Sequence, residues 1–264
     1  MQPAGAATVP QAAAESEADK LTALVSNYTK DRAAILGARP ARVGTIAFDR
    51  GPSGSPEQAK ALADQAAAAL AQLRTIKTSE LTHDQWVFYG IAEAQARLDA
   101  ENTADFFWLT SVITPYSSGL RTLTAPFAAA PLTTSADRDA YIAALNQLPA
   151  TMKAYETRLA QQVAHGVALP TEELRLVIPF VRSLSAPAPK SGLSVAAARL
   201  SAPPAADQAV FTTRVNDAIT KTVNPSIDAL AAYLDGPYRA HTVKNVGVSQ
   251  YPHGPAPWWG ARRG

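Results

Sequence analysis

One apolar stripe near the end of the chain constrains the fold more than any other part of the sequence. Seven large apolar residues recur there at steps of three or four: Phe211, Val215, Ile219, Val223, Ile227, Leu230 and Leu234. Because an α-helix completes a turn in about 3.6 residues, this spacing predicts one long helix over 207–234 with a buried face. Pro225 predicts a kink in that helix, and Gly236 predicts its end.

Shorter stripes predict two helices in the first part of the chain. Apolar residues recur at helical steps over 15–36, and Gly37 then provides a stop. Ser55 and Pro56 form a start signal for a second helix, because serine is a favoured N-cap and proline suits the first helical position. One face of this second helix carries Leu62, Ala66, Leu70 and Leu73.

A third helix is predicted after Thr82, which has Gln85 three residues on and so resembles a capping box. One face of this helix carries Val87, Ile91, Ala94 and Leu98. Another face carries Trp86, Tyr89, Gly90, Glu93 and Arg97. Because aromatic residues at helical spacing usually belong to a core, we interpret Trp86 and Tyr89 as core residues rather than as a platform for a ligand.

The aromatic stretch that follows, over 105–127, loses the helical period and contains Pro115, Gly119 and Pro126. It predicts an irregular segment with a short helix near 119–124. The stretch is nevertheless too apolar to lie fully in water.

Helices are predicted again from Ser135, which would act as an N-cap, and from Thr171, which would cap a helix that Pro179 kinks. Between them lies a helix that ends before Gly166 and carries the stripe Leu148, Met152, Tyr155, Leu159 and Val163. Four prolines and many small residues over 185–206 predict a linker or a long surface loop.

Together these patterns predict an all-α fold, an irregular array of about seven to nine helices. Residues 1–14 read as a disordered lead, 15–246 as one helical domain, and 247–264 as a loop with a tail. The apolar runs are far too short for a membrane span. The start of the chain has neither the positive charge nor the apolar run of a signal peptide, and whether such a peptide once preceded Gln2 stays open.

The composition excludes several classes of site. A formal net charge of +2, with lysines and arginines scattered singly, argues against nucleic-acid binding. The absence of cysteine excludes disulfides, thiolate metal sites and a cysteine nucleophile.

The histidines do not form a metal motif. A zinc hydrolase needs two histidines one helical turn apart and a nearby carboxylate, yet none of His83, His165, His241 and His253 has another histidine within five residues. We interpret His83 as a residue of a first helical turn, His165 as one of a last turn, and the other two as loop residues. The sequence therefore identifies no catalytic and no metal-binding residue, leaves substrate-binding residues unassigned, and leaves open whether the chain is an enzyme.

The order of several segments resembles that of a known bacterial family. The segments are "LTHDQWVFYGIAEAQARLDAE", "WLTSVITPYSSGLRTL" and "SADRDAYIAALNQLPATMKAYETRLAQQVAHGVALP", the last of which ends in a Gly-Val-x-Leu-Pro joint. A second joint of the form Gly-x-x-x-x-Pro-x-Gly follows the long helix, at Gly247, Pro252 and Gly254. Over 21–254 the chain thus resembles the "domain of unknown function 885" family.

The resemblance implies a mainly helical, zinc metallopeptidase-like protein about twice as long, often secreted or attached to lipid, with its zinc motif in a second half. None of those zinc ligands has a counterpart in this chain, so no cofactor is expected in it. The resemblance also implies a periplasmic or secreted location, although a cytoplasmic one stays open.

Three hypotheses follow for the function. The first is the N-terminal helical half of such a protein, inactive by itself, with the missing half or a peptide substrate as its partner. In that case Trp258 and Trp259 belong to a truncated or out-of-frame end rather than to a tail that folds back on the helices. The second is a self-sufficient binding module that contacts a partner through 106–116 and these tryptophans. The third is one subunit of a two-chain enzyme.

Overall fold

The computed structural model describes residues 15–36, 42–44, 46–47, 54–101, 104–116, 118–201 and 203–252. These residues belong to two units, the first drawn from 1–37 and 56–103 and the second from 38–55 and 104–264. The sequence had predicted one helical domain over 15–246, without a division inside it. The predicted lead over 1–14 lies outside the described residues.

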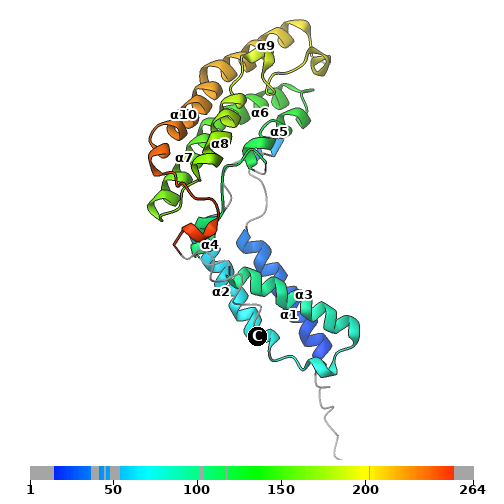
Figure 1. The fold of residues 1–264 in the computed structure, drawn as a ribbon. Coiled ribbons are helices and arrows are strands. Elements are labelled where there is room, and N and C mark those ends of the chain that lie inside the picture. Colours follow the sequence, from blue (N-terminus) through cyan, green and yellow to red (C-terminus); the bar gives the residue numbers. More distant parts are fainter. Residues whose placement is uncertain are drawn as a thin grey trace, which may run out of the picture. The chain divides into compact units, whose positions relative to one another are not determined.

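The described residues of the first unit form the helices labelled α1, α2 and α3 in Figure 1, which match the predicted ones closely. They are α1 (Glu17–Leu36), α2 (Pro56–Leu73) and α3 (His83–Glu101), with the short 3₁₀ turn η1 (Thr78–Glu80) before α3. The predicted capping box of α3 is present, since the Gln85 amide donates to Thr82 Oγ1 at 3.4 Å and the Thr82 amide donates to Gln85 Oε1 at 2.9 Å. Its buried core is Leu21, Tyr28, Ala66, Ala69, Leu73, Ile76, Ala92 and Ala96.

The apolar face predicted for α3 is not the face that the first unit buries. Val87, Ile91 and Leu98 are 40%, 64% and 56% exposed, whereas Ala92 and Ala96 are buried. The helix instead turns its small residues toward the core, where Ala66 and Ala69 of α2 also lie. Trp86, interpreted above as a core residue, is exposed as well. We call Val87, Ile91 and Leu98 the α3 face.

The side of α3 that is buried also carries a carboxylate. Asp99 is buried and accepts hydrogen bonds from Tyr28 Oη at 2.5 Å, Arg32 Nε at 2.6 Å and Gln95 Nε2 at 3.0 Å. Because a buried charge without partners is costly, the two donors on α1, Tyr28 and Arg32, favour burial of this side of α3.

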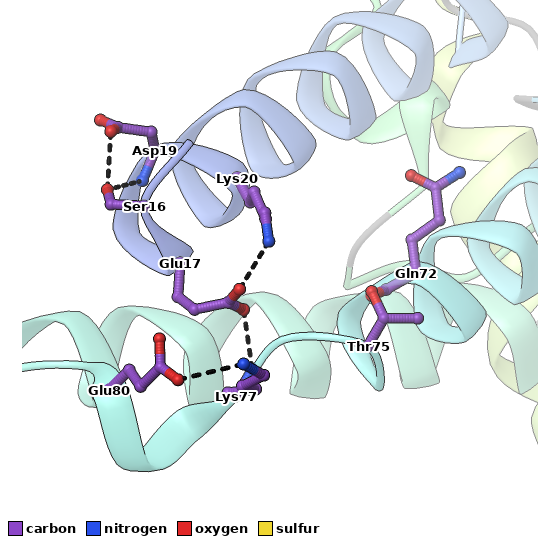
Figure 2. A network of polar contacts seen from close by, with 8 residues as sticks. All are labelled: Ser16, Glu17, Asp19, Lys20, Gln72, Thr75, Lys77 and Glu80. Atoms are coloured by element: carbon purple, nitrogen blue, oxygen red, sulfur yellow. Dashed lines mark hydrogen bonds and ion pairs between the residues drawn. The ribbon is translucent and has the colours of Figure 1, made fainter. Parts of the chain in front are cut away.

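A second polar network lies at the first turn of α1, as Figure 2 shows. The Glu17 carboxylate is buried, and it accepts hydrogen bonds from Lys20 Nζ at 2.6 Å and from the Lys77 amide at 2.9 Å. These hydrogen bonds, that of Lys20 first, hold the pKa of Glu17 below its ordinary value. Glu17 thus ties the first turn of α1 to the segment after α2.

The second unit contains most of the chain. Its α-helices are α4 (Ala104–Leu109), α5 (Ala125–Ala129), α6 (Ser135–Leu145), α7 (Leu148–Ala164), α8 (Thr171–Leu184), α9 (Ala205–Ala218) and α10 (Asn224–Asp235). Short 3₁₀ turns are η2 (Gly119–Thr122), η3 (Ala188–Lys190), η4 (Ala197–Leu200), η6 (Tyr238–His241) and η7 (Val248–Gln250). A small antiparallel pair, β1 (Arg42–Val43) and β2 (Ile46–Ala47), aligns Val43 with Ile46. The all-α prediction is confirmed, with this pair as a minor addition.

The long apolar stripe from Phe211 to Leu234 forms a central part of the core of the second unit. α9 and α10 form one continuous helix through a π-helical turn, η5 (Ile219–Val223), and all seven predicted stripe residues are buried. In that turn the Asn224 amide donates to the Ile219 carbonyl, five residues back. Pro225, which has no amide to donate, follows at the start of α10. The irregularity predicted at Pro225 therefore lies in the turn before it.

The aromatic stretch also packs into the second unit, as its apolar character required. Phe107 and Trp108 of α4 are buried, and α4 itself was not predicted. Two residues of α7 hold this segment: Arg158 Nη2 donates to the Phe107 carbonyl at 2.9 Å, and Gln162 Nε2 donates to the Trp108 carbonyl at 2.7 Å. The predicted short helix near 119–124 appears as η2.

Two predicted caps and the predicted linker need correction. The N-cap of α6 is Thr134, which forms a capping box with Asp137, and the N-cap of α8 is Pro170, so each helix is capped one residue before the predicted position. The stretch over 185–206 is not a free linker, because Ala188, Leu193 and Leu200 are part of the core.

Candidate functional site

A cavity of about 200 Å³ lies in the second unit, beside the end of α7 and the start of α8. Its remaining walls come from the end of α4 and the residues after it, from Tyr238 of η6, and from Gly247 and Tyr251 on either side of η7. Its lining is Leu109, Ser111, Gln162, Val167, Ala168, Leu169, Pro170, Glu173, Tyr238, Gly247 and Tyr251. Most of the surface of this lining is apolar, and Glu173 is the side chain in it that can carry a negative charge near neutral pH.

One wall of the cavity is the short segment that connects α7 to α8 and contains the Gly-Val-x-Leu-Pro joint. α7 ends at Ala164, and Gly166, two residues later, has a φ of 74°, a left-handed conformation that glycine adopts without strain. The chain then crosses Val167 to Pro170, and Pro170 forms an isolated parallel bridge with Val243. The Thr171 amide donates to the Val243 carbonyl at 2.9 Å, which holds the two segments side by side.

Two tyrosines attach the later turns to this joint. Tyr238 Oη of η6 accepts a hydrogen bond from the Leu169 amide at 2.9 Å. Tyr251, just after η7, donates from its hydroxyl to the Ala168 carbonyl. Burial raises the pKa of both phenols, so both hydroxyls are protonated at neutral pH.

Glu173 is the electrostatic centre of the cavity. It lies in the first turn of α8 and is partly buried, and burial raises the pKa of its carboxyl. Within the part of the chain that the structure describes, no lysine, arginine or histidine forms an ion pair with it. After burial, the charge of Glu173 is the second cause that raises the pKa of Tyr251.

Gln162 and Ser111 complete the polar lining. Gln162 Nε2 donates to the carbonyls of Trp108 and of Thr110, at 2.7 and 2.9 Å, and so positions the wall that contains Leu109 and Ser111. Ser111 Oγ lies 3.2 Å from the Ile113 carbonyl and 3.4 Å from Glu173 Oε1. A hydroxyl has one proton, so Ser111 cannot donate fully to both acceptors.

The histidines remain separate. His83 stands in the first turn of α3 and stacks on Trp86, whereas His165 caps the end of α7 and stacks on Trp108 with ring centroids 3.9 Å apart. His241 ends η6 and is exposed. His253 lies outside the described residues. Within those residues no group of three metal-ligating side chains lies together, so they do not fit the zinc that the resemblance implies for the full-length protein.

The surface suggested above for a binding module is only partly exposed. Phe107 and Trp108 are internal, and Tyr116 is 73% exposed. The Phe106 side chain, Trp258 and Trp259 lie outside the part of the chain that is described.

The sequence did carry one signal for the cavity. Its two family-like joints, Gly-Val-x-Leu-Pro at 166–170 and the stretch from Gly247 to Pro252, both reach this site, because Gly247 lines the cavity and Pro252 packs beside Gly166. Glu173 itself gave no signal, since an acidic residue in a first helical turn is common.

Comparison with known proteins gives a family and a fold. The model of a family described as "Bacterial protein of unknown function (DUF885)" matches residues 33–260. The fold is similar to the crystal structure of "the putative lipoprotein from Colwellia psychrerythraea", with a TM-score of 0.56 and 13% identity over 90% of this chain. The chain spans 44% of that structure's length. No curated protein matches the chain. None of the described helices has the length and apolar character needed to cross a membrane.

Proposed function

Because the chain belongs to the DUF885 family of bacterial proteins, we propose that it is the helical N-terminal part of a longer DUF885 protein and binds a ligand in the cavity beside Glu173. The observation that carries this proposal is that the two joints by which the sequence resembles the family both border this cavity. A largely apolar cavity with a few convergent polar groups is the usual form of a small-ligand site, which favours a functional role.

In this proposal the chain binds and does not hydrolyse. The resemblance implies that the longer proteins carry their zinc motif in another half, and the helices of this chain would then wall the approach of a peptide. The similar structure spans more than this chain, which supports a part of a larger protein. Its description as a lipoprotein supports a periplasmic or secreted location.

Two measurements test the proposal. Peptides added to the ¹⁵N-labelled chain are expected to shift amide resonances of 166–173 and 241–252 and to leave those of 83–101 unchanged. Incubation of the purified chain with zinc and a peptide library is expected to give no turnover. Turnover that a chelator abolishes would contradict the second expectation, and unchanged amide resonances at the cavity would contradict the first.

A second candidate function is a self-sufficient interaction module, and the α3 face favours it. A helix that is apolar on two faces usually buries both, and Ile91 and Leu98 are more than half exposed. An independent module should be monodisperse in light scattering and should melt without aggregation. A separated half of a larger protein should instead aggregate.

A further inference from the structure

The polar groups that line the cavity differ in how far their hydrogen-bonding capacity is used. Gln162 donates to two backbone carbonyls, and Tyr251 donates to the Ala168 carbonyl. Ser111 divides one proton between Ile113 and Glu173. Tyr238 Oη accepts from the Leu169 amide. The Glu173 carboxylate is the charged group of the lining, and it lacks a cation partner among the described residues.

We propose that the cavity binds a primary ammonium group on an unbranched apolar stem, with the ammonium on the Glu173 carboxylate. This inference rests on the proposed ligand-binding function and names its ligand class. An ammonium brings three hydrogen-bond donors and a positive charge to a carboxylate that has a shared serine hydroxyl as its donor and no cation partner among the described residues.

The charge balance argues for a cation rather than for an anion or a neutral polar group. A partly buried carboxylate without a counter-charge is destabilised, and burial accordingly raises the pKa of Glu173. A ligand ammonium would supply that counter-charge inside a site of reduced dielectric constant, where the attraction is stronger than in water. An anionic ligand would meet a like charge and no lysine or arginine in the lining.

The volume of the cavity and its apolar lining favour a ligand whose ammonium stands on a chain of methylene groups. Pockets for drug-sized ligands have volumes of roughly 300 to 1,000 Å³, and the volume here is about 200 Å³. The space therefore suits a single side chain or a small amine. Leu109, Val167, Leu169 and Pro170 supply apolar surface along which a chain of methylene groups can lie.

The same chemistry can come from a free alkylamine or from the side chain of a lysine in a peptide. The experiment therefore uses two matched pairs of probes on the full chain. The first pair is n-pentylamine and n-pentanol. The second pair is a capped Gly-Lys-Gly peptide and the same peptide with norleucine in place of lysine. Amide resonances of 166–173 and 241–252 report binding.

We expect each amine to bind at least about tenfold more tightly than its neutral counterpart, which corresponds to about 1.4 kcal/mol. Glu173→Gln, which keeps the shape and removes the charge, is expected to abolish this difference. Glu172→Gln is the matched control, because the neighbouring Glu172 is exposed and pairs with Arg175. This control is expected to keep the preference for amines.

The outcomes separate this inference from the proposed function. A preference for either amine that is lost in Glu173→Gln supports the inference, and the pair in which it appears identifies a free amine or a peptide lysine as the source. Equal binding of amine and neutral probe at the cavity overturns the amine preference and leaves the binding function standing. A Glu173→Gln variant that still prefers amines overturns the role of Glu173. No binding of any probe overturns both proposals.

Discussion

Asp99 shows how one buried carboxylate can hold a small helical unit together. Tyr28 and Arg32 of α1 and Gln95 of α3 all donate to it. Burial, followed by the hydrogen bond to Asp99, raises the pKa of Tyr28 well above its ordinary value. The phenol therefore stays a donor throughout the ordinary pH range.

We predict that Asp99→Ala destabilises the first unit by ~2 to 3 kcal/mol, because it leaves a tyrosine and an arginine without their acceptor. Arg32 is partly exposed, which keeps the loss below that of a fully buried pair. Urea unfolding followed by circular dichroism measures the change. Glu93→Ala, which removes an exposed pair with Arg97, is the control and should cost less than about 0.5 kcal/mol.

Glu173 should behave in the opposite way, because its charge opposes folding. Its folded-state pKa lies above the ordinary value, so the stability present below its unfolded pKa is lost as the pH rises through the folded pKa. Glu173→Gln is therefore predicted to leave Tm at pH 7 unchanged or to raise it. Below about pH 4, where the carboxyl is protonated in both states, the two proteins should melt alike. A Tm at pH 7 that falls clearly in the variant would indicate a structural role for the charge.

At the scale of single helices, α3 presents two apolar faces and buries only one of them in its own unit. We predict that the double variant Ile91→Gln, Leu98→Gln changes the free energy of unfolding by less than about 1 kcal/mol, since both side chains are already exposed. The variant should also bind less of a hydrophobic dye.

The matched control for the α3 face is Ala96→Leu on the opposite side of the helix. Ala96 is fully buried between helices, so the larger side chain should cost roughly 1 to 3 kcal/mol through overpacking. A large loss of stability in the double variant, as great as that of Ala96→Leu, would mean that the α3 face is covered in solution.

The helices themselves could be predicted where one physical signal dominated. The stripe from Phe211 to Leu234 is buried in full, because large apolar residues at one spacing leave only one face for the core. On α3 two faces competed, and the choice depended on Tyr28 and Arg32, which lie on another helix. Periodicity within one helix cannot contain that information.

The candidate site was less predictable than the helices. Its joints stood out by resemblance, but Glu173 matters because it lines one cavity together with Leu109, Tyr238 and Tyr251. Those residues lie far from Glu173 in the sequence, and only the folded chain brings them together. The same limit applies to the stretch over 185–206, whose prolines indicate a loop but say nothing of the buried Leu193 and Leu200 within it.

At the scale of the whole chain, two units with separate cores should unfold separately. We predict two transitions in calorimetry. Asp99→Ala should lower the Tm of one, and Leu230→Ala, which creates a cavity at a buried position of α10, should lower the Tm of the other by destabilising it ~2 to 5 kcal/mol. A single transition that both variants shift equally would contradict this independence.

The contacts that close the cavity also determine when it forms during folding. Leu169 and Tyr238 are separated by 69 residues along the chain, and Ala168 and Tyr251 by 83. Contacts of such long range form late, because closing a long loop costs entropy before any bond repays it. A chain that has formed its helices but not yet these contacts would therefore have its cavity open on one side.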